Sequence, residues 1–173
     1  MKLNKIMLAA AVAFGVSSTA FAADQGHGKV TFSGAITDAP CSISPGSADQ
    51  TVELGQVSNS LLKKGGKSVP KAFTIDLEHC ELEKDKSKVS VTFNGVESKN
   101  GMLAISGTAS GASVAITDAG GKILPLGTAS TAVDVKEGNT TMRFAAYLQG
   151  DTASGAVVPG DFTAIADFTM AYQ

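Results

Sequence analysis

The chain has 173 residues, 17% of them charged, with 14 basic and 16 acidic side chains. This slightly acidic balance does not provide the basic face that nucleic-acid phosphates require, so we exclude nucleic acid as a partner. After the N-terminus, no apolar run approaches the roughly 18 residues of a membrane helix, so we expect no membrane-spanning segment.

The first 22 residues have the pattern of a secretory signal peptide. Lys2 and Lys5 form a basic start, residues 8–16 form an apolar stretch of about nine residues, and Ala-Phe-Ala at 20–22 supplies the small residues of a cleavage site. The alternative, a buried N-terminal helix, does not account for charge, length and small residues occurring in this order. We therefore predict a mature chain that starts at Ala23. Its formal charge is −4, because the peptide removes two lysines and no acid, leaving 12 basic and 16 acidic side chains.

Short segments of the mature chain alternate between apolar and polar residues, which is the pattern of half-buried strands. These segments cover residues 30–36, 73–77, 89–93, 114–116, 142–148 and 162–172. A turn signal, Asp-Ala-Gly-Gly at 118–121, separates residues 114–116 from a further apolar run at 123–126. A short helix is expected at 58–64 and a charged loop at 80–88. Together these patterns predict a single all-β sandwich domain.

The two cysteines, Cys41 and Cys80, are the only ones in the chain. An even pair in an exported protein predicts a disulfide, and closing a loop of about 40 residues contributes roughly 4 kcal/mol in the chain-entropy model. The alternative, a metal site, needs further ligands, and His27 and His79 do not complete a zinc spacing. We therefore predict a Cys41–Cys80 disulfide, no metal and no other cofactor.

The sequence contains no recognisable catalytic motif. Gly65-Gly66-Lys67-Ser68 is similar to the end of a phosphate-binding loop, but Leu61 stands where the full motif needs a glycine. The Gly-x-Ser-x-Gly pattern of a nucleophile elbow is absent. The prediction is therefore a structural or binding protein and not an enzyme.

The two ends of the mature chain are unusual. Residues 162–172 form the longest alternating run, and the chain stops one residue later, so this strand is expected to be an integral part of the sheet. At the other end, residues 30–36 alternate just before Cys41, and an exposed alternating segment needs a sheet to bury it. The sequence leaves open whether that sheet is the chain's own or a neighbour's.

The mature chain resembles the major subunits of chaperone–usher pili, of the P-pilus and mannose-resistant fimbrial type. Residues 25–34, QGHGKVTFSG, resemble the family's N-terminal donor segment, and residues 38–43, DAPCSI, resemble the motif around its first cysteine. Cys80 falls where the second cysteine is expected. Gly160, followed by the alternating run to Tyr172, resembles the C-terminal recognition strand.

The resemblance implies an immunoglobulin-like sandwich that lacks its last strand and is completed by a strand from a neighbour. It implies a signal peptide at 1–22, a donor segment at 23–36 and a pilin domain at 37–173. The implied donor residues are Gly28, Val30, Phe32, Gly34 and Ile36. The implied groove and chaperone-binding strand carries Gly160, Phe162, Ala164, Ala166, Phe168, Met170 and Tyr172.

The implied function is a structural subunit that polymerises into a surface pilus and supports adhesion. The implied partners are identical subunits, a periplasmic chaperone, an outer-membrane usher and the minor or tip subunits of the pilus. The chain would be secreted through the periplasm and displayed on the bacterial surface. The alternative is a minor pilus adaptor or a single-domain secreted binding module.

Overall fold

We describe the protein from a computed structural model, which describes residues 27–151 and 157–173. Contacts divide the chain into two units, residues 1–36 and 37–173. The predicted signal peptide and residues 23–26 of the predicted donor segment lie outside the described residues. Residues 27–36 belong to no helix or strand. The strand predicted over 30–36 is therefore not formed in the single chain, because an extended segment without a neighbour makes no ladder hydrogen bonds.

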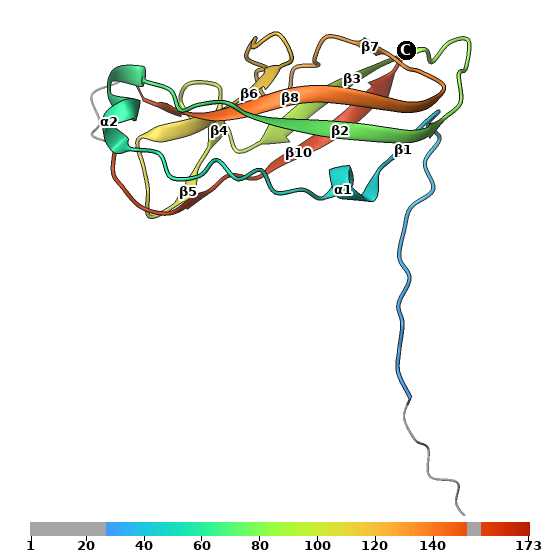
Figure 1. Ribbon diagram of the computed structural model, residues 1–173, viewed down its shortest axis with the longest axis horizontal. Helices are drawn as coiled ribbons and strands as arrows, with labels where there is room; N and C mark the ends of the chain where they lie inside the picture. The colour runs from blue at the N-terminus through green and yellow to red at the C-terminus, as the bar shows by residue number, and fades with distance from the viewer. Residues whose placement is uncertain (1–26, 152–156) are drawn as a thin grey trace, which may run out of the picture. The chain divides into compact units, whose positions relative to one another are not determined.

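The second unit contains a five-stranded antiparallel sheet (Figure 1). Its strand order is β1 (Ser42–Ile43), β2 (Lys71–Cys80), β8 (Gly138–Gly150), β6 (Ala112–Asp118) and β4 (Leu103–Ala104). The long strands β2 and β8 pair from Lys71 opposite Ala146 to Cys80 opposite Gly138. The alternating runs at 73–77, 114–116 and 142–148 all lie in strands of this sheet, as predicted.

A second sheet packs against the first. Its order is β10 (Ala166–Tyr172), β3 (Lys88–Gly95) and β7 (Val133–Asp134), and a separate pair joins β5 (Ser106–Gly107) to β9 (Phe162–Thr163). Strand β10 pairs with β3 over its whole length, from Ala166 opposite Gly95 to Tyr172 opposite Val89. Within the described residues, no strand pairs with the other edge of β10.

In residues 27–151 and 157–173, helices are few and short. They are α1 (Pro45–Ala48), α2 (Asn59–Leu62) and the 3-10 turn η1 (Lys63–Gly65). The helix predicted at 58–64 is thereby confirmed. Ser58 caps it, since its side-chain oxygen accepts a hydrogen bond from the Ser60 N–H at 3.3 Å. In the described part of the chain, no helix combines the length and apolar character needed to cross a membrane.

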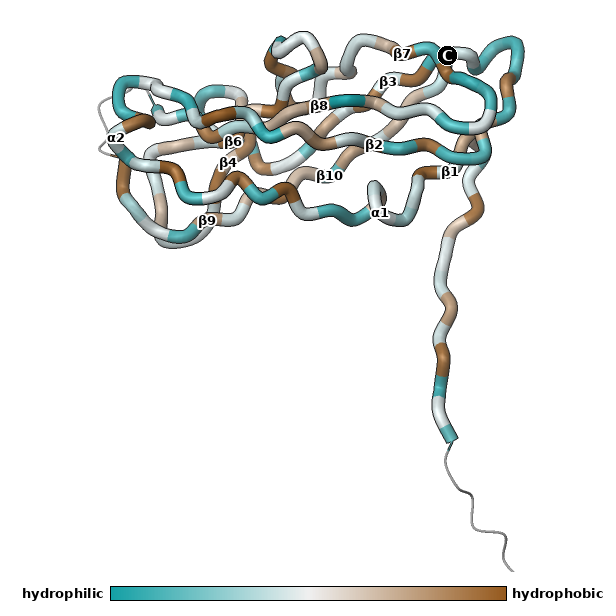
Figure 2. Tube along the Cα trace, viewed as in Figure 1, coloured by the Kyte–Doolittle hydropathy of each residue, from teal (hydrophilic) through white to brown (hydrophobic). Residues whose placement is uncertain are grey.

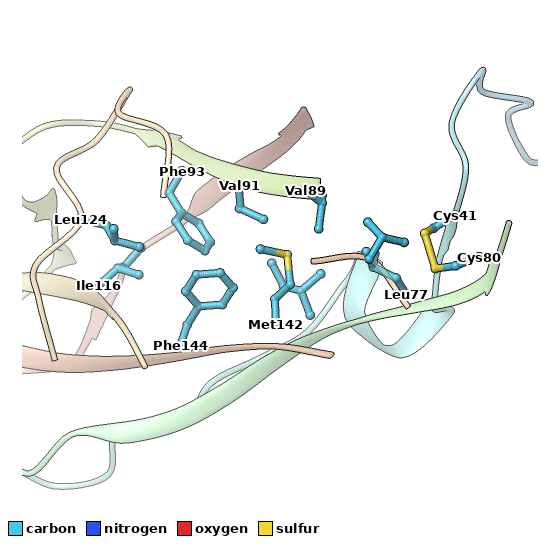
Figure 3. Close-up of a cluster of buried hydrophobic side chains, with 12 residues drawn as sticks. Cys41, Leu77, Cys80, Val89, Val91, Phe93, Ile116, Leu124, Met142 and Phe144 are labelled. Atoms are coloured by element: carbon cyan, nitrogen blue, oxygen red, sulfur yellow. A yellow bond between two sulfur atoms is a disulfide. The ribbon is translucent and has the colours of Figure 1, made fainter. Parts of the chain in front are cut away.

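The core lies between the two sheets. Figure 2 shows hydrophobic and hydrophilic positions alternating along the strands, and Figure 3 shows the inward side chains of β3 facing those of β8. The most completely buried large side chains are Ile75, Leu77, Met142, Val89 and Val91. This arrangement is a β-sandwich, in which two inner faces supply one core.

The prediction of one long final strand over 162–172 is wrong. Residues 162–163 pair with β5, whereas residues 166–172 pair with β3, so the chain changes sheet between them. The longest strand is β8, with 13 residues. The alternation of half-buried and exposed side chains nevertheless continues without a break from Phe162 to Tyr172, which explains why the sequence pattern suggested a single strand.

Candidate functional site

A groove of about 1230 Å³ runs along one side of the sandwich. Residues 47–57, from the last turn of α1 to the segment before α2, form one wall, and residues 157–168 form the other. The floor is apolar and consists of core side chains from both sheets: Phe73, Ile75, Phe93, Leu103, Val114, Ile116, Ala146 and Leu148. The groove therefore opens onto the interior of the sandwich.

The second wall carries most of the predicted recognition strand. Gly160, Phe162, Ala164, Ala166 and Phe168 all line the groove. Met170 and Tyr172 are not among the described residues that line it. Instead, they pack against the larger core cluster, beside the disulfide end of the sandwich.

The edge of β10 is the polar component of the site. β10 is bonded to β3 on one side only, so backbone N–H and C=O groups on its groove side have no strand partner among the described residues. Such an edge is a template for another strand. An apolar floor beside an unpaired strand edge therefore suits an extended peptide with alternating apolar side chains.

The structure explains why position 160 is a glycine, which the sequence alone did not. A Cβ added there would lie 2.5 Å from the Thr108 hydroxyl oxygen and 2.6 Å from the Ala109 nitrogen. The next residue, Asp161, accepts hydrogen bonds from the N–H groups of Thr108 and Ala109 at 3.0 and 3.1 Å. Glycine thus lets the start of this wall lie against the loop before β6.

The first wall, residues 47–57, was not predicted. Its apolar side chains, Val52, Leu54 and Val57, are half-buried and face the groove. The alternation of Thr51, Val52, Glu53 and Leu54 is a sequence signal for this wall, but it spans few residues. The hydroxyl of Ser47 anchors the wall to β2 by accepting a hydrogen bond from the Asp76 N–H at 2.9 Å.

The disulfide between Cys41 and Cys80 is confirmed. It joins the segment before β1 to the last residue of β2, and both cysteines are buried. The Glu81 N–H donates to the Pro40 carbonyl at 2.9 Å, next to the disulfide. These bonds fix the point at which residues 37–40 leave the sandwich.

Residues 27–36 carry apolar side chains that are exposed to solvent. Val30, Phe32 and Ile36 are 74%, 90% and 105% exposed relative to an extended reference. Added Cβ atoms at Gly28 and Gly34 would meet nothing within 4 Å. An alternating set of exposed apolar side chains is costly in water and gains by burial.

Four exposed carboxylate residues, Asp49, Glu53, Asp161 and Asp167, line the groove, and none of the described lining residues is a lysine, arginine or histidine. The groups with shifted pKa values lie elsewhere: the salt bridge to Lys88 lowers the pKa of Asp134, its Glu83 and Asp38 partners raise that of Lys86, and burial raises that of Tyr172. No group of three or more His, Cys, Asp or Glu side chains in the described residues is placed to hold a metal ion. The site therefore offers an apolar floor, unpaired backbone groups and a rim that carries carboxylates.

Comparison with known proteins places this geometry in context. The fimbrial protein family matches residues 30–173. The chain is 63% identical over 175 residues to Fimbria A protein of Serratia marcescens, and 52% identical over 177 residues to the Major MR/P fimbria protein of Proteus mirabilis strain HI4320, with 100% of each chain covered in both cases.

Two solved pilus structures are also similar to this chain. The P pilus rod subunit PapA is 33% identical with a TM-score of 0.69, and the match covers 78% of this chain and 100% of that one. A chaperone–usher pilus structure concerned with rod uncoiling is 36% identical with a TM-score of 0.75, covering 86% of this chain and 97% of that one.

Proposed function

Because this chain belongs to the fimbrial protein family and is a structural subunit of a surface pilus, we propose that residues 23–36 fill the groove of an identical neighbouring copy. In this arrangement residues 37–173 form the pilin domain and residues 1–22 are the signal peptide. The two contact units of the chain meet at the same boundary, between Ile36 and Thr37, which supports the division.

The main support for the proposal is that one chain contains both an open groove and a segment suited to fill such a groove. The groove exposes an apolar floor beside the unpaired edge of β10. Val30, Phe32 and Ile36 are exposed apolar side chains at alternating positions. Strand addition from a neighbour satisfies both, because backbone hydrogen bonds supply affinity and alternating side chains set the register.

The proposed donor residues occupy every second position of the segment, so they share one face. On an extended strand, Gly28, Val30, Phe32, Gly34 and Ile36 point to one side. Gly34 lies between two bulky positions and allows the backbone to approach the groove closely. Gly160, Phe162, Ala164, Ala166 and Phe168 receive this face, while Met170 and Tyr172 continue the recognition strand toward the C-terminus.

An uncovered groove is a hazard before assembly, since unpaired strand edges and apolar surface promote aggregation. A periplasmic chaperone that lends a strand to β10 protects the exported subunit, and an outer-membrane usher then exchanges that strand for the donor segment of the next copy. Minor and tip subunits join by the same exchange. A chain truncated after Asp167 lacks most of β10, and we expect it not to co-purify with the chaperone.

The proposal is tested by linking a second donor segment to the C-terminus. A copy of residues 23–36 attached after Gln173 through a flexible linker has an effective concentration of about the millimolar range for the chain's own groove. We expect a monomer with a higher melting temperature than the unmodified subunit. A matched chain with Val30, Phe32 and Ile36 of the added copy replaced by serine should behave like the unmodified subunit. Equal polymerisation of both linked chains would contradict the proposal.

A further inference from the structure

Two segments of the chain that lie toward opposite ends of β2 differ in charge. Residues 58–71, which lead from α2 into β2, contain four lysines and no acid, whereas residues 76–85, at the other end of β2, contain five acids and one lysine, Lys84. Figure 1 shows α2 and β1 at opposite ends of the sandwich, and β2 spans the distance between them. The strand separates the two groups of charges by about 30 Å.

The lysine end lies at the mouth of the groove. Leu62 lines the groove and is 2% exposed, while the neighbouring Leu61 is 51% exposed. Lys63 and Lys64 follow in η1, both exposed, and neither forms an ion pair with a carboxylate of the described residues. Lys67 is engaged differently, with its ammonium 5.3 Å from the centre of the Tyr147 ring.

The carboxylate end lies where the N-terminal segment leaves the sandwich. Glu81 is tied to Pro40 by the 2.9 Å backbone hydrogen bond and has no ion-pair partner in the described chain. Leu82 is 54% exposed, and Glu83 lies 3.2 Å from Lys86. Figure 2 shows that the loop after β2 is mostly hydrophilic. The carboxylate end therefore presents Leu82 beside Glu81 and beside Glu83, which is paired with Lys86, whereas the lysine end presents Leu61 beside Lys63 and Lys64.

We infer that the carboxylate end of one copy, Glu81-Leu82-Glu83, docks on the lysine end of the next copy, Leu61 with Lys63 and Lys64. The inference rests on the proposed donor exchange. A donor strand antiparallel to β10 runs toward the lysine end, because β10 runs away from it, so Ile36 arrives near Leu62. Residues 37–40 span at most about 14 Å, which brings the donor's Pro40 and Glu81 to the acceptor's lysine end.

The contact combines a small apolar centre with complementary charges. Leu82 of one copy meets Leu61 of the next, and the surrounding Glu and Lys side chains attract each other across the junction. Exposed charges of this kind act mainly by steering the encounter of two surfaces, and salt weakens the effect. The expected consequence is faster and correctly oriented capture of each new subunit.

Charge reversal tests the inference. Using mature subunits, the initial rate of oligomer formation is measured at low and high salt for Lys63→Glu/Lys64→Glu, for Glu81→Lys/Glu83→Lys, and for the four substitutions together. We expect each double variant to assemble about tenfold more slowly at low salt, and the fourfold variant to recover most of the wild-type rate. Lys122→Glu/Arg143→Glu, the same charge change on the side of the sandwich, should leave the rate nearly unchanged.

A donor peptide separates this inference from the proposed function. The peptide of residues 23–36 contains one acid and one lysine, so it has no net charge from its side chains. We expect it to enter the groove of wild-type and Lys63→Glu/Lys64→Glu subunits at the same rate. If the peptide binds both and the fourfold variant is no faster than the double variants, the end-to-end contact is wrong while donor exchange stands. If the peptide does not bind the wild-type groove, both are wrong.

Discussion

The ring of Phe168 on β10 lies with its centroid 6.4 Å from that of Phe93 on β3, and both side chains line the groove. Phe93 in turn packs edge-on against Phe144, with centroids 5.2 Å apart. The groove is therefore continuous with the aromatic centre of the core. We expect a side chain inserted there to extend the hydrophobic core and so to stabilise the subunit.

Replacing Phe168 by alanine should weaken the subunit even without a donor. Fully buried Phe→Ala changes cost about 3–5 kcal/mol, and we expect about 2 kcal/mol here because Phe168 is only half-buried. Urea denaturation of the mature chain measures the loss. Ile165→Ala, at a neighbouring side chain that is 75% exposed, serves as control and should cost less than about 0.5 kcal/mol. Equal losses for the two variants would contradict the packing role of Phe168.

Cys41→Ser should cost about 2–5 kcal/mol of folding free energy, because the disulfide closes a long loop and fixes the start of β1 on β2. Reducing agent should destabilise the wild type by a similar amount and should not affect a Cys41→Ser/Cys80→Ser chain. The melting temperatures of the two chains, measured with and without reductant, test this expectation. A wild-type melting temperature that does not respond to full reduction would show that the bond is not a source of stability.

Gly160→Ala should destabilise the groove wall by about 1–3 kcal/mol, since the added methyl group meets Thr108 and Ala109. Gly46→Ala is the matched control, because a Cβ at Gly46 in α1 meets nothing within 4 Å. That control should be neutral or slightly stabilising. Urea denaturation midpoints of the two variants measure the difference. If Gly160→Ala is as stable as the wild type, the groove wall does not need a glycine at this position.

The stability of the subunit should fall at alkaline pH partly through Tyr172. Burial raises the pKa of this hydroxyl above its usual value of about 10, so folding favours the neutral phenol. The contribution is complete below pH 10, the pKa in the unfolded chain, and is lost as pH rises through the folded pKa. Tyr172→Phe has no such group, and its urea midpoint should fall less than that of the wild type above pH 10. Parallel curves would contradict the assignment.

The sequence predicted the sheet elements well where one face is buried. Residues 73–77, 89–93 and 142–148 alternate because each strand has one face on the core, and the structure places all three in strands. The disulfide was predicted from two cysteines in a chain whose first 22 residues have the pattern of a signal peptide. These features depend on local pattern and composition, which one sequence contains.

Features set by tertiary contacts were not predictable in the same way. The break between β9 and β10 preserves the side-chain alternation, so nothing local marks the change of partner from β5 to β3. The wall at 47–57 has no regular secondary structure over most of its length, and its apolar alternation covers only a few residues. Gly160 is required by contacts with a loop about 50 residues earlier in the chain. The donor and groove residues were assigned from a family resemblance, and their roles remain predictions.

Fibre formation by a Gly34→Arg subunit tests the central claim most directly. In the proposed exchange, position 34 of the donor faces the apolar groove, where an arginine side chain has no space and a buried unpaired charge costs roughly several kcal/mol. Ser33→Arg is the matched control, because its side chain points away from the groove on an extended donor strand. We expect the Gly34→Arg subunit to fold and be exported without forming fibres, while Ser33→Arg forms them. Wild-type amounts of fibre from Gly34→Arg would mean that residues 23–36 do not enter a neighbour's groove.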